Sequence, residues 1–78
     1  MANTRRQDAQ PHLLAFGRRL AALRLERGMT QEDLAERSGL GPNVLSQIEN
    51  GRRDVRISAL WLLAEGLGVT LADLVADL

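Results

Sequence analysis

Leucine and other apolar residues recur at intervals of three and four positions along most of this chain. The pattern is clear from Leu13 to Leu23 and again from Ile57 to Leu67. This spacing places apolar side chains on one face of an α-helix, whereas a half-buried strand would show strict alternation. Aromatic residues make up only 3% of the chain and β-branched residues are few, which disfavours a pleated sheet. We therefore predict an all-α fold.

Helix-capping signals divide the chain into short segments. Thr30 and Thr70 are each followed three residues later by an Asp, a combination typical of a helix start. Pro42 suits the first turn of a helix, and Gly28 and Gly39 are typical of helix ends. We predict five helices with short connections, at about residues 11–27, 31–38, 42–50, 57–67 and 70–77.

The chain has 78 residues and no Cys. This length supports a single domain with one modest core, which we expect at residues 10–78. The polar residues 1–9 lack apolar periodicity and are expected to form a flexible N-terminal arm. Without Cys there is neither a disulfide framework nor a thiolate metal site, and no apolar run is long enough to span a bilayer. We expect a cytoplasmic protein with no metal, no cofactor and no membrane partner.

The supply of catalytic side chains is small. The chain contains one His and no Cys or Tyr, so only scattered carboxylates and hydroxyls remain to activate a substrate. His12 has no second ligand at metal-binding spacing and is interpreted as a surface residue. We do not expect an enzyme.

The formal net charge is zero, but the charges are unevenly distributed. Residues 1–27 carry six Arg and two acidic residues, whereas residues 57–78 carry three acidic residues and no basic residue. A basic cluster interrupted only by Asp54 lies between them and consists of Arg52, Arg53 and Arg56. Separated charge allows one face to bind a polyanion, while charge alone favours a solvated surface of mixed sign. Arg5 and Arg6 are interpreted as part of an ordinary tail rather than as a DNA-binding arm.

The predicted helices 31–38 and 42–50 are joined by a short turn that contains glycine. The second helix carries amide side chains away from its apolar residues Leu45 and Ile48. Two such helices describe a helix-turn-helix. The stretch from Phe16 to Val75 resembles the Xre/Cro-type, lambda-repressor-like family of phage and bacterial regulators. The matching segments are FGRRLAALRLERGMTQEDLAERSGL (16–40), VLSQIENGRR (44–53) and LWLLAEGLGVTLADLV (60–75).

This resemblance implies a sequence-specific DNA-binding transcriptional regulator. It acts as a homodimer on a roughly palindromic operator and places helix 42–50 in the major groove. Asn43 and Gln47 match base-reading positions, and their amides can pair with adenine N6 and N7. Val44 flanks them and would either contact a thymine methyl group or fill the core. The expected phosphate contacts are Gln31, Ser46, Asn50, Arg52, Arg53 and Arg56.

The chain departs from the family at the start of that helix. Relatives usually have Ser or Thr at the cap and a long polar residue after it, whereas Gly41 and Pro42 stand here and neither reads a base. Specificity is therefore expected to rest mainly on Asn43 and Gln47, with help from Arg52, Arg53 and DNA shape. Arg24 and Glu49 also match family positions. In relatives these positions form a partly buried ion pair that ties the first helix to the end of the recognition helix, so both residues are interpreted as structural.

More apolar residues lie near the C-terminal end than are required to form one buried helix face. Trp61 lies partly off the stripe of Leu60, Leu63 and Leu67, and a small domain rarely leaves a Trp in solvent. The expected homodimer surface consists of Trp61, Leu62, Val75 and Leu78. The alternative is that Trp61 covers the first helix.

Narrower functions remain open. Single-domain relatives include the controller proteins of restriction–modification systems, to which the segment RDVRI (53–57) is similar, and antitoxins of toxin–antitoxin modules. A second class of function is a protein-interaction module whose acidic C-terminal half binds a basic partner protein. Asn43 and Gln47 beside Arg52 and Arg53 favour the DNA-binding regulator, because an adaptor need not keep them together.

Overall fold

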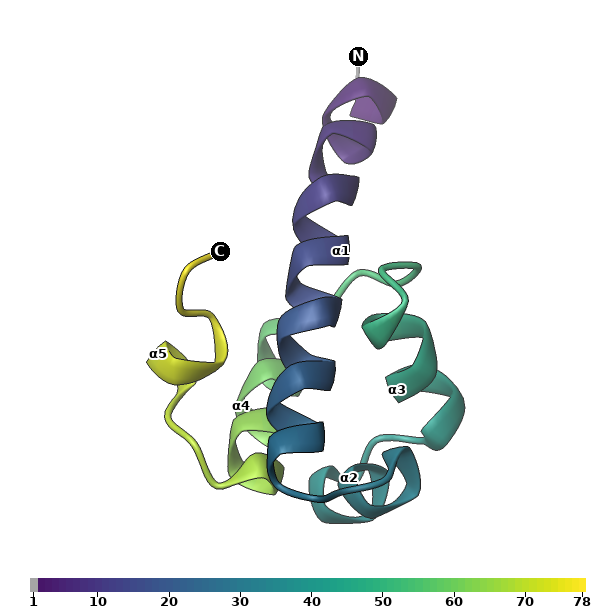
Figure 1. Cartoon of the computed structure of the whole chain (residues 1–78). Coiled ribbons are helices and arrows are strands. Elements are labelled where there is room, and N and C mark those ends of the chain that lie inside the picture. Colours follow the sequence, from purple (N-terminus) through teal and green to yellow (C-terminus); the bar gives the residue numbers. More distant parts are fainter. Residues whose placement is uncertain (1) are drawn as a thin grey trace.

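The computed structural model describes the backbone of residues 2–78 and the side chains of residues 10–78. It has five helices and, over residues 2–78, no strand, which confirms the all-α fold (Figure 1). The helices are α1 (Ala2–Glu26), α2 (Gln31–Ser38), α3 (Pro42–Glu49), α4 (Ile57–Leu67) and α5 (Leu71–Leu74). None of the described helices combines the length and apolarity needed to cross a membrane.

Capping interactions set most of the helix boundaries. Thr30 Oγ1 accepts a hydrogen bond from the Asp33 backbone N–H (3.0 Å), and Asp33 Oδ2 accepts one from the Thr30 N–H (2.9 Å). Thr70 and Asp73 form the same reciprocal pair before α5. The predicted bounds of α2 and α4 are confirmed, and α3 ends at Glu49 instead of residue 50. Positive φ angles occur at four glycines near helix ends, namely Gly28, Gly39, Gly51 and Gly68.

The first helix begins earlier than the sequence pattern predicts. It starts at Ala2 rather than near residue 11, so the backbone of residues 2–9 is helical where an irregular arm is expected. The prediction relied on the lack of an apolar face in this segment. Extension of a helix that is already nucleated needs no apolar face and carries no new nucleation cost, although Pro11, which lies inside α1, donates no backbone hydrogen bond to this extension.

The last helix is shorter than predicted. It ends at Leu74 rather than near residue 77, and Asp77 has a φ angle of +64°. Leu74 is fully buried, whereas Val75 and Leu78 remain 38% and 54% exposed. Short helices in proteins are maintained mainly by burial of an apolar face. Little burial therefore holds the chain in helical form beyond Leu74.

The core is a cluster of apolar side chains contributed by all five helices. Its fully buried members are Leu20, Leu34, Leu45, Ile48, Leu63 and Leu74. In the fold α2 packs against α4, while α3 and α5 each pack against α1. Figure 1 shows α3 and α5 on opposite sides of α1.

Glycine permits the close contact between α1 and the end of α3. A Cβ at Gly17 would lie 2.5 Å from the backbone oxygens of both Ile48 and Glu49. Gly51 has a φ angle of +69°, and a Cβ there would lie 2.8 Å from Leu14 Cα. These two contacts fix the end of α3 and the loop that follows it against α1.

Candidate nucleic-acid interface

The turn between α2 and α3 is built from residues 39–41. Gly39 ends α2 in the left-handed conformation, and the Leu40 backbone N–H donates to Ser38 Oγ (3.2 Å). Gly41 is the N-cap of α3 without a side-chain hydrogen bond, and Pro42 occupies the first turn. The first residues of α3 are thus placed by backbone geometry, and its N-terminal end carries no polar side chain before Asn43.

Two of the three predicted base-reading side chains lie on the exposed side of α3. Asn43 and Gln47 are exposed and are four residues apart, so they share one helix face. Val44 is half-buried and packs against the core. This position favours the alternative that Val44 fills the core over the alternative that it contacts a thymine methyl group.

The predicted phosphate contacts on α3 interact with each other. Asn50 Nδ2 donates to the Ser46 backbone oxygen (2.8 Å) and lies 3.5 Å from Ser46 Oγ. Asn50 is exposed and Ser46 is half-buried. Asn50 therefore also satisfies a carbonyl in the last turn of α3.

Arg24 and Glu49 form an ion pair that ties α1 to the end of α3. Arg24 Nε and Nη2 donate to the two carboxylate oxygens of Glu49 over 2.8 and 3.1 Å, and Arg24 Nη1 donates to the Met29 backbone oxygen (2.8 Å). The two side chains are only 12% and 6% exposed. The hydrogen bond to Glu49 raises the pKa of Arg24, although burial acts in the opposite direction.

Gln31 belongs to the same hydrogen-bonded group. Its Nε2 donates to Glu49 Oε1 over 2.9 Å, and its side chain is half-buried at the start of α2. Sequence reasoning expected Gln31 only as a phosphate contact and missed this bond. The residues are 18 positions apart, and only the packing of α2 against α3 brings them together.

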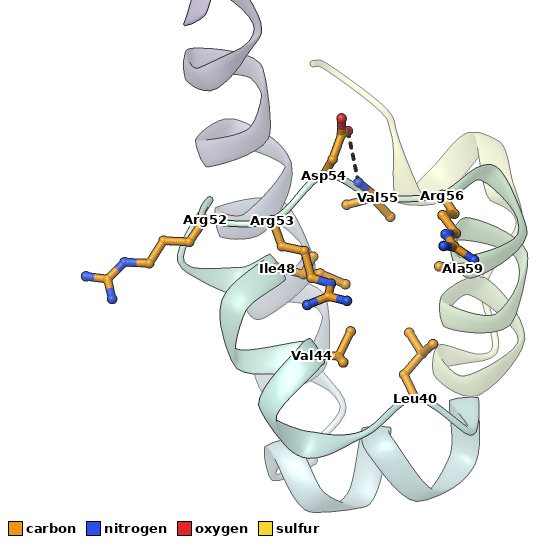
Figure 2. A pocket seen from close by; sticks show the side chains of 9 residues that line it. All are labelled: Leu40, Val44, Ile48, Arg52, Arg53, Asp54, Val55, Arg56 and Ala59. Atoms are coloured by element: carbon orange, nitrogen blue, oxygen red, sulfur yellow. Dashed lines mark hydrogen bonds between the residues drawn. The ribbon is translucent and has the colours of Figure 1, made fainter. Parts of the chain in front are cut away.

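The loop after α3 carries the predicted basic cluster. Arg52, Arg53 and Arg56 are all exposed, and Asp54 Oδ1 accepts a hydrogen bond from the Val55 N–H (3.1 Å). The loop borders an open pocket of about 790 Å³ between α3 and α4. Figure 2 shows its lining side chains, which combine the three arginines with an apolar group. That group consists of Leu40, Val44, Ile48, Val55 and Ala59.

Arg53 contacts the recognition face directly. Its Nη1 donates to Gln47 Oε1 over 2.7 Å. Sequence reasoning missed this contact, because a spacing of six residues across a helix end carries no recognisable signal. The side chains of Arg5 and Arg6 lie outside the described residues.

The comparisons with known proteins agree with this geometry. The sequence model of the family HTH_3, described as helix-turn-helix, matches residues 20–74. This chain belongs to the helix-turn-helix family. Its matched segment includes α2, the turn and α3.

Relatives of this helix-turn-helix protein include regulators and control proteins. An uncharacterized HTH-type transcriptional regulator, y4dJ of Sinorhizobium fredii, is 44% identical over 59 residues, which cover 76% of this chain and 77% of that protein. The control protein C.MunI of a Mycoplasma species is 38% identical over 66 residues, with coverages of 83% and 89%. The crystal structure of the restriction-modification controller protein C.AhdI from Aeromonas hydrophila superposes with a TM-score of 0.81 at 36% identity, covering 82% of this chain and 97% of that one.

The helix-turn-helix protein also exposes an apolar surface on α4 and after α5. Trp61 and Leu62 are 50% and 40% exposed, and Val75 and Leu78 lie near the end of the chain with similar exposure. Half of the Trp61 surface is thus exposed. We call these four residues the α4–α5 apolar surface.

Proposed function

We propose that this protein is a transcriptional regulator that binds double-stranded DNA with α3 in the major groove. The observation that carries the proposal is the exposed face of α3, where Asn43 and Gln47 stand next to a loop with three exposed arginines. Amide side chains read base edges, and guanidinium groups bind phosphate. The names of the relatives, which describe regulators and control proteins, support a regulator rather than an enzyme. The cytoplasmic location expected from the sequence is part of this proposal.

The backbone of the DNA would be held from both sides of α3. Gln31 lies in the first turn of α2, where free N–H groups and the helix dipole favour an anion. Its bond to Glu49 holds the amide in place and leaves a second N–H for a phosphate oxygen. Arg52 and Arg56 supply positive charge beyond α3, and Ser46 and Asn50 supply hydroxyl and amide groups between them. Contacts of this kind fix the position of the protein and supply affinity for any sequence.

A second copy of the chain would complete the binding unit. One α3 offers few base contacts, and joining two copies raises the apparent affinity without new contacts. The α4–α5 apolar surface is suited to a homodimer contact, and it lies on helices other than the recognition helix. Two recognition helices related by a two-fold axis read half-sites about 34–36 Å apart, on a roughly palindromic operator.

The test is fluorescence anisotropy with a labelled duplex of arbitrary sequence, at low salt and then with increasing salt. We expect binding at low salt and a steep linear fall of log affinity with log salt, because bound phosphates release counterions. Arg52→Ala should weaken binding. It should also reduce the magnitude of this slope by about 1, because one phosphate contact is lost. Absence of binding at low salt, or affinity that is independent of salt, would contradict the proposal.

The alternative of a protein-interaction module makes a different prediction. Such a module would bind through its acidic C-terminal residues and would be indifferent to changes in the Arg52–Arg56 loop. The exposed arginines beside Gln47 support DNA binding over this alternative.

A further inference from the structure

The hydrogen bond between Arg53 and Gln47 joins the basic loop to the exposed face of α3. Arg53 Nη1 and Gln47 Oε1 are 2.7 Å apart, and both side chains are exposed. Figure 2 shows the Arg53 side chain running back toward α3, while the side chain of the neighbouring Arg52 extends away from the pocket. Two adjacent arginines of one loop therefore occupy different positions relative to α3.

This contact changes what Gln47 presents to a ligand. A free glutamine amide offers an acceptor oxygen and a donor nitrogen, and the two can exchange places by rotation. Donation from Arg53 fixes the amide, with its oxygen facing the guanidinium and its Nε2 hydrogens free. Apart from the second lone pair of Oε1, which lies beside the guanidinium charge, the remaining polar groups of the pair are donors, namely the Nε2–H groups of Gln47 and the other guanidinium N–H groups of Arg53.

The base edges in the major groove distinguish such a pair from a lone glutamine. Guanine presents two acceptors, N7 and O6, whereas adenine presents the acceptor N7 beside the donor N6–H₂. A lone glutamine pairs with adenine through its oxygen and its nitrogen. In the pair, an adenine amino hydrogen would approach an oxygen that already faces a positive charge. A surface that presents mainly donors matches the two acceptors of guanine better than the mixed edge of adenine.

We propose that Gln47 and Arg53 act as one base-reading unit that selects guanine. This inference rests on the proposed function. It gives Arg53 a direct part in base reading, where the sequence led us to expect a phosphate contact and only some help with specificity, and it replaces adenine with guanine at the position read by Gln47. Arg52, which extends away, keeps the phosphate role.

The experiment is selection of bound sites from a random duplex pool, using the wild-type chain, Gln47→Ala, Arg53→Ala and Arg52→Ala. Arg52→Ala is the matched control, because it removes the same charge from the same loop. We expect the wild type to enrich a G·C pair at one position of each half-site. Gln47→Ala and Arg53→Ala should both lose about tenfold preference at that same position. Arg52→Ala should weaken all sequences and keep the preferred site.

A second measurement removes one of the two guanine acceptors, N7, instead of the side chain. The selected duplex is prepared with 7-deazaguanine at the enriched position, and its affinity is measured by anisotropy. The wild type should lose about tenfold in affinity, whereas Arg53→Ala should lose much less. The double variant Gln47→Ala/Arg53→Ala should lose little more preference than either single variant, because the two residues act as a unit.

Three results would overturn the inference. One is enrichment of adenine at the position that Gln47→Ala relaxes. Another is an Arg53→Ala variant that behaves like Arg52→Ala and keeps the full base preference. In both cases the wild type still selects a site, so the proposed function stands. If the wild type enriches no sequence, the proposed function fails and this inference fails with it.

Discussion

At the scale of single residues, Glu49 has the largest structural role in the interface. It lies 6% exposed and accepts hydrogen bonds from Arg24 and Gln31, so it joins α1, α2 and α3 at one point. The same bonds orient Gln31, which we propose as a phosphate contact. If Gln31 contacts phosphate as we propose, this carboxylate couples the stability of the fold to DNA binding.

We predict that Glu49→Ala lowers the stability of the protein. The change leaves the Arg24 guanidinium nearly buried without its partner, which costs about 2 kcal/mol or more. In a domain of this size that cost lowers the melting temperature by roughly 10 °C. Thermal unfolding followed by circular dichroism measures the shift, and Glu65→Ala, an exposed glutamate in α4, is the control. A melting temperature equal to that of the control would show that the ion pair does not stabilise the fold.

Part of the loss of folding stability at acidic pH should arise from Asp33. Hydrogen bonds from the Thr30 backbone N–H and hydroxyl group hold the pKa of Asp33 below its usual value of 3.8. A carboxyl group with a lowered pKa stabilises the folded state fully above its unfolded-state value, and this contribution is lost as the pH falls through the folded-state pKa. Stability should therefore decline below about pH 4, where Asp33 begins to bind a proton in the unfolded chain.

The variant Asp33→Asn tests this expectation. It should be less stable than the wild type at neutral pH and should approach the wild type in stability as the pH falls below 3.8. Melting temperatures between neutral pH and pH about 3 give the profile, and Glu32→Gln in the same helical turn is the control. A constant difference at all pH values would contradict a role for the charge of Asp33.

At the scale of helices, the contact between α1 and α3 depends on the absence of a side chain at Gly17. Helix propensity alone favours Ala over Gly by about 1 kcal/mol. Packing opposes this, since a Cβ at Gly17 would meet backbone oxygens of Ile48 and Glu49 at 2.5 Å. Backbone atoms at the end of a packed helix cannot rotate away, so packing should decide the outcome.

We therefore predict that Gly17→Ala destabilises the protein by about 1–3 kcal/mol. Chemical denaturation measures this difference. Gly66→Ala in α4 is the comparison and should cost less, because a Cβ there would lie 3.1 Å from the Leu34 side chain and 3.2 Å from the Ser38 backbone N, distances longer than those at Gly17. An increase in stability for Gly17→Ala would mean that α1 and α3 separate more easily than this packing indicates.

At the scale of the whole molecule, the recognition helix and the α4–α5 apolar surface are carried by different helices. In Figure 1, α3 and α5 lie on opposite sides of α1. A homodimer through α4 and α5 would therefore leave α3 of each copy free for DNA. The zero net charge of the chain does not oppose this arrangement, because its basic loop lies beside α3.

We predict that Leu62→Glu gives a folded monomer with weakened DNA binding. Leu62 is 40% exposed, so a Glu there can reach solvent in the monomer but would introduce a charge into a dimer contact. Sedimentation velocity measures the association, and anisotropy measures the DNA affinity. Leu25→Glu, a change at a more exposed leucine on α1, is the control and should dimerise normally. Unchanged sedimentation of Leu62→Glu would exclude this surface as the dimer contact.

Local signals in the sequence determined most of the fold. The Thr30–Asp33 cap and Gly39 bound α2, and Gly68 ends α4, because capping acts within one helical turn. The start of α1 and the end of α5 were predicted less well, since they depend on helix extension and on burial rather than on a local signal. Asn43 and Gln47 were placed correctly on the exposed face, because helical period alone decides which residues share a face.

What the sequence by itself determined is therefore the number of helices, the helix-turn-helix and the side chains that face outward. Tertiary structure alone decided how these side chains pair. Gln31 meets Glu49, and Arg53 meets Gln47, because the packing of helices and the course of a loop bring together residues that no short-range pattern connects. Hydrogen bonds act over about 3 Å, so the chemistry presented by a side chain depends on neighbours that only the folded chain supplies.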